Sequence, residues 1–270
     1  MTNAESFISH LVELRTRLVR AVASVLVVFV ALFLWPGAGP IYDWLSEPLI
    51  HALPEGSKMI AIGVVTPFLV PMKVTALVAF LVALPYVLYQ LWAFVAPGLY
   101  EHERKLALPV VISSTILFLA GVAFCYYIVF VRVFTFIQHF APKSIAPAPD
   151  IEAYFSFVIT MFLAFGITFE IPIIVMVLVR VGVVSVDKLR AARPYVIVGA
   201  FIAAAVVTPP DVISQFMLAV PMCLLYEAGL FFGRFVTKRT AEAKESEETD
   251  DGGEEKPMTD EDMDRELDRN

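Results

Sequence analysis

The chain has 270 residues, of which 59% are hydrophobic and 17% are charged, and its mean hydropathy is +0.75. A soluble domain is about half apolar with about a quarter of its residues charged, so this composition excludes an ordinary soluble enzyme or nucleic-acid-binding protein. It predicts an all-α, polytopic membrane protein.

The net charge of −7 is unevenly distributed along the chain. The last thirty residues, 241–270, contain fourteen acidic and four basic residues, whereas residues 1–240 carry a net charge of +3. A segment with so little apolar content buries too little surface to fold. We therefore expect a membrane domain at residues 1–240 and an acidic, disordered cytoplasmic tail at residues 241–270.

A charged cluster at the N-terminus, His10–Arg17, precedes the first apolar segment. Phe7, Leu11, Leu14 and Leu18 recur at helical spacing, which predicts an amphipathic helix lying at the cytoplasmic interface. No small-residue cleavage site follows the first apolar run, so we expect no cleavable signal peptide.

Six apolar segments are long enough, or nearly long enough, to span a membrane as helices. The predicted spans are Ala21–Trp35, Met72–Val95, Leu108–Val131, Tyr154–Val179, Tyr195–Val207 and Val212–Phe232. The fifth span is unusual, because thirteen residues rise about 20 Å and the hydrocarbon core is ~30 Å thick. Locally thinned bilayer or a re-entrant hairpin would accommodate this short segment.

Lysine and arginine residues predict the orientation in the membrane. With the N-terminus inside, the cytoplasmic segments hold sixteen of these residues, or twelve without the tail. The opposite side holds four: Lys58, Lys73, Arg132 and Lys143. The positive-inside rule therefore predicts cytoplasmic termini and an even number of spans.

Two proline-rich segments are expected on the outer side. The first, Pro36–Pro71, contains a short amphipathic helix at Tyr42–Leu49, and the second covers Arg132–Ala153. Together they are predicted to cap the outer face. The proline and glycine breaks in the two halves of the chain do not correspond, which argues against an inverted-repeat carrier.

A second charged cluster follows the second span. The stretch Trp92–Lys105 (WAFVAPGLYEHERK) breaks at Pro97 and ends in a charged run. If it meets the N-terminal cluster on the cytoplasmic side, Glu13 and Glu103 form a carboxylate site suited to a guanidinium group. The alternatives are an anchor for anionic lipid and ordinary surface ion pairs, with Arg15 or Arg104 as the partner.

Glu170 is an ionisable residue in the middle of the fourth span. It lies about ten residues, or about 15 Å, from the cytoplasmic end of that span. A carboxyl group at such depth is costly and indicates either a functional site or a buried hydrogen bond between helices. Gln90 and Gln215 are expected to make interhelical hydrogen bonds.

No catalytic or metal-binding motif is evident. The four histidines lack the spacing of a metal site, and no nucleophile elbow or phosphate-binding glycine loop occurs. We expect no enzyme activity, no cofactor and no metal. Cys125 and Cys223 lie in apolar segments and are interpreted as small hydrophobic residues.

Five motifs together resemble the TatC family, the multispanning receptor subunit of the twin-arginine protein translocase. They are HLVELRTRL (10–18), YQLWAFVAPGLYEHERK (89–105), FGITFEIPI (165–173), LRAARPYVIVGAF (189–201) and TPPDVISQ (208–215). The resemblance covers residues 7 to about 235 and implies six helices with cytoplasmic termini, the last two short, in a concave, glove-like bundle in the bacterial cytoplasmic membrane.

The resemblance also implies a set of functional residues. Signal-peptide binding would involve Glu13, Arg15, Arg17, Trp92, Phe94 and Glu103. Glu170 would be the buried intramembrane carboxyl, Thr208 and Gln215 would contact partner subunits, and Pro48 would lie in the outer cap. The expected partners are twin-arginine signal peptides of folded precursors, single-span TatA-like and TatB-like subunits in a multimeric complex, and membrane lipid. The proton-motive force would drive export.

Two other functions are compatible with the residues alone. A proton-coupled small-solute carrier would use Glu170 as a relay, although such carriers usually contain more intramembrane charges. A passive scaffold for other membrane proteins would leave the carboxylates in the charged clusters without a ligand.

Overall fold

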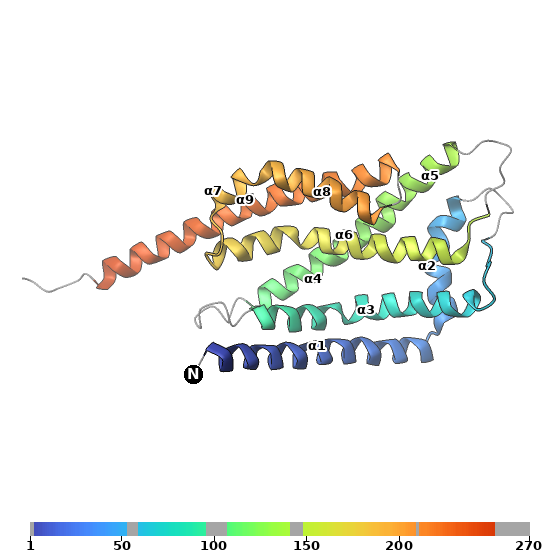
Figure 1. The fold of residues 1–270 in the computed structure, drawn as a ribbon, viewed down its shortest axis with the longest axis horizontal. Coiled ribbons are helices and arrows are strands. Elements are labelled where there is room, and N and C mark those ends of the chain that lie inside the picture. The colour runs from blue at the N-terminus through green and yellow to red at the C-terminus, as the bar shows by residue number, and fades with distance from the viewer. Residues whose placement is uncertain (1–2, 53–58, 96–106, 141–147, 209–210, 252–270) are drawn as a thin grey trace, which may run out of the picture.

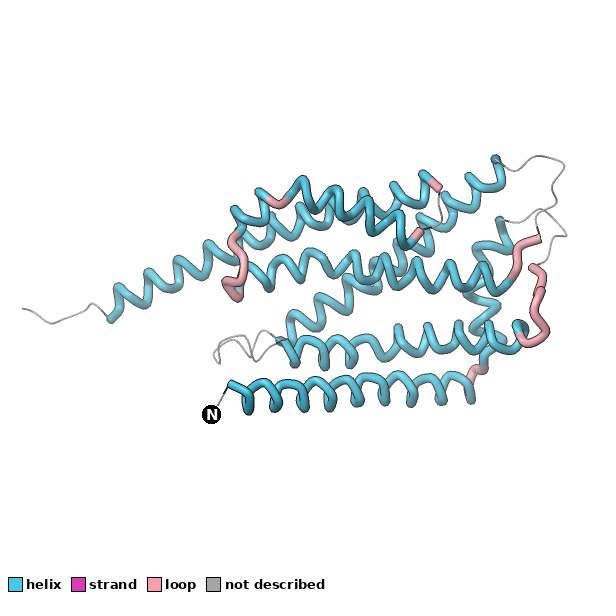
Figure 2. The backbone as a smooth tube through the Cα atoms, in the orientation of Figure 1, coloured by secondary structure: helices cyan, strands magenta, loops and turns pink. Residues whose placement is uncertain are grey.

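The structure is a computed structural model, and it describes residues 3–52, 59–95, 107–140, 148–208 and 211–251. The described residues are almost entirely helical, and they contain no strand beyond one isolated bridge between Ile60 and Asp150 (Figure 2). The elements are α1 (Asn3–Leu34), α2 (Ala38–Ala52), α3 (Thr66–Val95), α4 (Ala107–Phe124), the π-helical segment η3 (Cys125–Val129), α5 (Phe130–Phe140), α6 (Ile151–Arg180), α7 (Val186–Ala191), α8 (Arg193–Val207) and α9 (Val212–Asp251).

Five helical stretches in the described residues are long and apolar enough to cross a membrane, and they confirm an all-α membrane protein. The stretches are 10–34, 66–94, 108–136, 151–180 and 212–234. The predicted fifth span corresponds to α8, which has only 15 residues. At about 1.5 Å per residue α8 rises about 22 Å, so the count of six crossings and the orientation remain predictions.

The main helix contacts run in series through the molecule. The packed pairs are α1–α3, α3–α4, α4–α6, α6–α9 and α8–α9. In Figure 1, the N-terminus, α7 and the far end of α9 all lie at the same end of the molecule, and α2 lies at the other end. Both ends of the described chain therefore leave the bundle on the same side.

The first helix differs from the prediction of a separate helix at the interface. α1 is one continuous helix from Asn3 to Leu34 and is straight in Figure 1, so the charged cluster extends the axis of the first span. No proline or glycine interrupts residues 3–34, and nothing in the backbone breaks the helix there. Gly37, with φ of +96°, then provides the left-handed turn into α2.

Helices also extend into the two predicted outer segments. α2 begins at Ala38 and contains the predicted helix, while α5 continues to Phe140, inside the predicted second segment. α2 packs on α3 and α5. Trp44 on α2 stacks on Tyr126 with ring centroids 5.8 Å apart, so α2 covers one end of the bundle as expected.

The last helix continues past the predicted domain boundary at residue 240. α9 runs to Asp251 and includes the first residues of the acidic tail, whereas residues 252–270 lie outside the described part. The division into a membrane domain and a disordered tail therefore remains a prediction, and its boundary falls inside a helix.

The core lies where α4 and α5 cross α6. Phe130, Phe155, Phe162 and Phe165 are fully buried there, and the rings of Phe130 and Phe162 stack with centroids 5.5 Å apart. The π-helical segment η3 joins α4 to α5 at this crossing and rotates the following side chains relative to a regular α-helix.

Candidate cytoplasmic peptide site

The N-terminal charged cluster lies against the end of α3. The imidazole of His10 on α1 stacks on the ring of Phe94 on α3, with centroids 4.4 Å apart and planes 21° from parallel. Phe94 is the penultimate residue of α3, and the chain then enters residues 96–106. The first cluster is thus joined to the beginning of the second, but Glu103 and Arg104 lie outside the described residues.

Glu13 is held by an ion pair within α1. Its Oε1 accepts hydrogen bonds from Nε of Arg17 at 2.9 Å and from Nη2 at 2.6 Å. Glu13 thus pairs with Arg17 rather than with Arg15, one of the two expected candidates, because Arg17 lies four residues away on the same face of the helix. The other candidate, Arg104, lies outside the described residues. Oε2 of Glu13 accepts no hydrogen bond from the described residues, and it remains available to a ligand.

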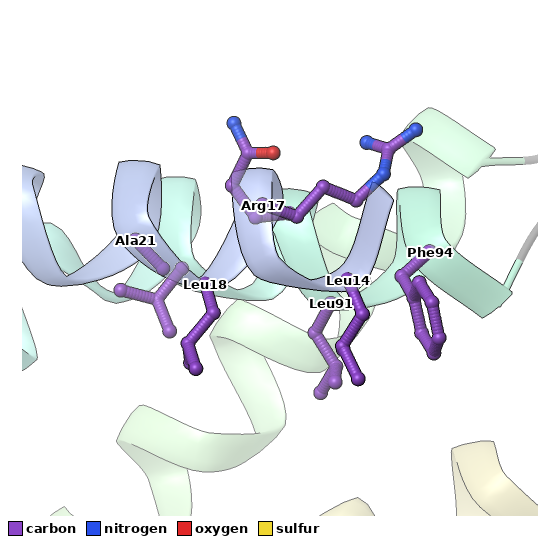
Figure 3. A pocket seen from close by; sticks show the side chains of 8 residues that line it. Leu14, Arg17, Leu18, Ala21, Leu91 and Phe94 are labelled. Carbon is purple, nitrogen blue, oxygen red and sulfur yellow. The ribbon is translucent and has the colours of Figure 1, made fainter. Parts of the chain in front are cut away.

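A small cleft lies between α1 and α3 near this ion pair, with a volume of about 150 Å³. The lining residues are Leu14, Arg17, Leu18, Ala21, Val87, Gln90, Leu91 and Phe94. Figure 3 shows the side chains of Leu14, Leu18, Leu91 and Phe94 pointing to the same side, while the guanidinium of Arg17 points away from them. The cleft is apolar and has room for an apolar side chain.

Trp92 has a different surrounding from Phe94. Trp92 does not line the cleft, and its indole Nε1 donates a hydrogen bond to Oγ of Ser114 on α4 at 2.9 Å. Trp92 thereby ties α3 to α4, and Ser114 is fully buried. No motif in the sequence pointed to Ser114, because its contact with Trp92 depends on the packing of two helices.

Glu170 is buried on α6, with a relative exposure of 7%. Neither carboxyl oxygen has a hydrogen-bond partner of normal geometry among the described residues. Ser114 on α4 lies at the level of Glu170: Gly166 of α6 faces the ring of Phe118 of α4, and Ser114 and Glu170 each lie one turn from that contact, in the same direction along the two antiparallel helices (Figure 1). The structure therefore places Glu170 as a carboxyl group without a partner inside the bundle.

The predicted partner-contact residues lie around the turn between α8 and α9. Thr208 is buried and donates its hydroxyl to the carbonyl of Ala204 at 2.8 Å. Nε2 of Gln215 donates to the carbonyl of Phe201 at 3.2 Å, which confirms the predicted interhelical bond. Oε1 of Gln90, in contrast, is buried without a partner among the described residues. Pro48 belongs to α2, but its side chain lies outside the described part.

A polar cluster at the other end of the molecule was not predicted. Nζ of Lys73 on α3 lies 3.1 Å from Oε1 of Glu152 on α6, and the Thr66 hydroxyl donates to Oε2 of Glu152. Asp150 caps α6 by accepting from the backbone N–H of Ala153 at 3.1 Å. The two contacts of Glu152, with Lys73 and Thr66, link residues about eighty positions apart, which local sequence patterns do not reveal.

A family model described as TatC, the Sec-independent protein translocase protein, matches residues 9–221. A TatC protein of Halothiobacillus neapolitanus is 52% identical over 252 residues, covering 93% of this chain and 68% of the relative. A TatC protein of Escherichia coli K12 is 46% identical over 233 residues, covering 86% of this chain and 90% of the relative.

A solved structure gives the same result. A crystal structure of the twin-arginine translocase receptor TatC matches with a TM-score of 0.75 and 35% sequence identity, and it covers 84% of this chain and 99% of the solved chain. The relatives are named as components of a protein translocase, which is a transport system rather than an enzyme family. The chain therefore belongs to the TatC family of Sec-independent protein translocase proteins, multispanning proteins of the bacterial inner membrane.

Proposed function

We propose that this chain is the receptor and core component of a twin-arginine translocase. It binds twin-arginine signal peptides of folded precursors at the cytoplasmic face and assembles with TatA-like and TatB-like single-span subunits, and the proton-motive force drives export. Support comes from the family and from one observation above all, the stack of His10 on Phe94. Because of this contact, Glu13 lies one helical turn from the segment that leads to Glu103.

The chemistry of the ion pair on α1 fits a guanidinium ligand. Arg17 orients the Glu13 carboxylate through Oε1 and leaves Oε2 available for an incoming donor. A guanidinium presents a planar fork of donors, which an ammonium group lacks, so paired arginines are recognised better than paired lysines. Glu103 supplies the second carboxylate in this proposal.

The apolar part of the signal peptide follows the membrane-facing side of the same region. The cleft between α1 and α3 accepts one apolar side chain beside Phe94, and Trp92 stabilises α3 from the opposite side. Thr208 and Gln215 mark the surface for single-span subunits at the turn between α8 and α9, and Pro48 belongs to the outer cap.

Peptide binding to the purified protein in nanodiscs tests the proposal. Removing a charge-assisted hydrogen bond costs about 1.5–3 kcal/mol, so Glu13→Gln and Glu103→Gln should each weaken binding of a labelled twin-arginine peptide by about ten-fold or more. Glu103→Lys should abolish it, because it adds repulsion. Fluorescence anisotropy measures the affinity.

Two controls make the result specific. Glu152→Gln neutralises a carboxylate that is about half exposed at the opposite end of the bundle, and it should leave affinity unchanged. Glu170→Gln should weaken initial binding far less than Glu13→Gln does, since this carboxyl is deep in α6. Equal affinity for the Glu13, Glu103 and control variants would refute the receptor site, and so would equal affinity for a twin-lysine peptide.

A further inference from the structure

A line of three polar side chains runs from the last turn of α3 into the bundle to α6. Trp92 lies on α3, Ser114 on α4 and Glu170 on α6, and α4 packs against both other helices. Figure 1 shows α4 passing between α3 and α6. Ser114 is fully buried and Glu170 nearly so, hence their hydrogen-bonding groups have few alternative partners.

The bond from Trp92 determines what the Ser114 hydroxyl can do. An indole N–H is only a donor, so Oγ of Ser114 acts as the acceptor of the 2.9 Å bond. The serine proton is then left for donation elsewhere. Two other hydroxyls in these helices donate to the carbonyl four residues back, Thr115 to Val111 on α4 and Thr75 to Pro71 on α3.

Ser114 donates no such bond to its own helix among the described residues, and the acceptor that lies nearby is the carboxyl of Glu170. Both oxygens of Glu170 lack a hydrogen-bond partner among the described residues, and Ser114 lies at the level of Glu170, one turn from the contact of Phe118 with Gly166. Two cations on helices that pack against α6 are paired away from Glu170. Lys73 on α3 pairs with Glu152 at 3.1 Å, and Arg193 on α8 pairs with Glu227 on α9 at 2.6 Å.

We infer that Ser114 is a positioning residue that couples Trp92 to Glu170. While the indole occupies the oxygen of Ser114, the hydroxyl proton is directed at the Glu170 carboxyl. When Trp92 is displaced, Ser114 rotates to bond the carbonyl four residues back, at Val110, which is the usual alternative for a serine in a helix. Glu170 then loses its polar neighbour.

This coupling rests on the proposed function, because it gives the aromatic segment beside the peptide site a route to the buried carboxyl. Engagement of Trp92 by a signal peptide at the end of α3 would change the environment of Glu170 one helix beyond α4. No large movement of helices is required, since the switch is a single rotamer of Ser114.

The coupling is measurable without any peptide. The chain has three tryptophans, so Trp92 is the only one left in a protein with Trp35→Phe and Trp44→Phe. Its ¹⁵N-labelled indole N–H then gives one NMR cross-peak in nanodiscs. Ser114→Ala should move this cross-peak by removing the acceptor. Ser113→Ala is the matched control, because Ser113 is the exposed neighbour on the same helix, and it should leave the cross-peak in place.

The decisive variant is Glu170→Gln. It should move the Trp92 cross-peak in the parent protein but not in the Ser114→Ala background, because the serine transmits the change. Ser114→Cys, which keeps a weak donor of similar size, should retain part of the response and shows whether a loss comes from misfolding. The coupling would be overturned if Glu170→Gln leaves the Trp92 cross-peak in place, or if it moves the cross-peak equally in the parent protein and in the Ser114→Ala background.

Addition of a twin-arginine peptide separates the two proposals. If the peptide does not bind by anisotropy, the receptor function fails while the peptide-free coupling can still hold. If the peptide binds, the Trp92 cross-peak should move and the response to Glu170→Gln should disappear. Binding that leaves both unchanged contradicts the inferred link between peptide site and carboxyl.

Discussion

At the level of single residues, the crossing of α4 and α6 depends on two glycines. A Cβ atom at Gly121 would lie 2.6 Å from the backbone oxygen of Phe165, and one at Gly166 would meet the buried ring of Phe118. Helices in membranes often approach closely through such small residues. The approach here brings Ser114 and Glu170, on the same two helices, into the same interior.

Gly121→Ala should therefore destabilise the protein by about 1–3 kcal/mol, the usual cost of overpacking a core. Gly166→Ala should cost less, since a phenyl ring can shift more readily than a backbone carbonyl. Thermal unfolding in detergent, followed by circular dichroism, measures both. Gly199→Ala is the control, because nothing lies within 4 Å of its Cβ position, and it should be neutral or slightly stabilising. A stable Gly121→Ala protein would contradict the packing of α4 on α6.

Among the residues of the peptide site, some were predictable from spacing and others were not. Glu13 and Arg17 are four apart in a helix, so their ion pair follows from the sequence, although Arg15 and Arg104 were the candidate partners named for the carboxylates. The bond between Trp92 and Ser114 joins positions 22 apart, and the orphaned oxygens of Glu170 depend on what surrounds it. Such contacts require the packed helices.

At the level of whole elements, the contacts of Asp150, Glu152 and Lys73 fix the first turns of α3 and α6. Asp150 accepts from the backbone N–H of Ala153 and, at 3.4 Å, from that of Ile62. Lys73 and Glu152 are each about half exposed, so their ion pair is screened by water. The helix cap should therefore contribute more than the ion pair.

Asp150→Ala should lower the free energy of unfolding by about 0.5–2 kcal/mol, because it removes an N-cap. Glu152→Gln should lower it by less than about 1 kcal/mol, as expected for an exposed pair. Chemical denaturation in detergent gives both values. If the order is reversed, the ion pair is better shielded than its exposure indicates.

Most helices were predictable as elements, because apolar runs of the length of a membrane are strong signals. Their ends and continuity were harder. The amphipathic cluster is part of the continuous helix α1. The sequence did not predict this, because an apolar stripe does not reveal the angle between a helix and the membrane. The π-helical segment at Cys125–Val129 has no sequence signature, and the extension of α9 to Asp251 runs against the expectation from an acidic composition.

At the level of the whole molecule, the serial packing of helices determines which parts can communicate. α1 packs on α3, and α9 with α8 lies beyond α6. The proposed peptide site on α1 and α3 is thus separated from the turn between α8 and α9 by α6, which α3 contacts both directly and through α4. Among the main helix contacts of the described residues, every path between these two surfaces passes through α6, and Glu170 lies on that helix.

The number of membrane crossings depends on α8, whose 15 residues form the shortest of the predicted spans. If α8 and α9 both cross, the turn between them lies on the outer side, although α8 rises only about 22 Å against a hydrocarbon core of ~30 Å. Single cysteines in a background with Cys125→Ala and Cys223→Ala decide this. Val212→Cys, at the exposed start of α9, should react with a membrane-impermeant maleimide added to intact cells.

Two further positions calibrate the labelling. Val64→Cys, at a residue that is 98% exposed on the predicted outer side, should also react in intact cells. Asp187→Cys, at an exposed position in α7, should react only after the membrane is permeabilised, because the excess of lysine and arginine predicts that α7 is cytoplasmic. Labelling of Val212→Cys only together with Asp187→Cys would make α8 a re-entrant or surface helix. That result would also move Thr208 and Gln215 to the cytoplasmic side and require a different surface for the single-span subunits.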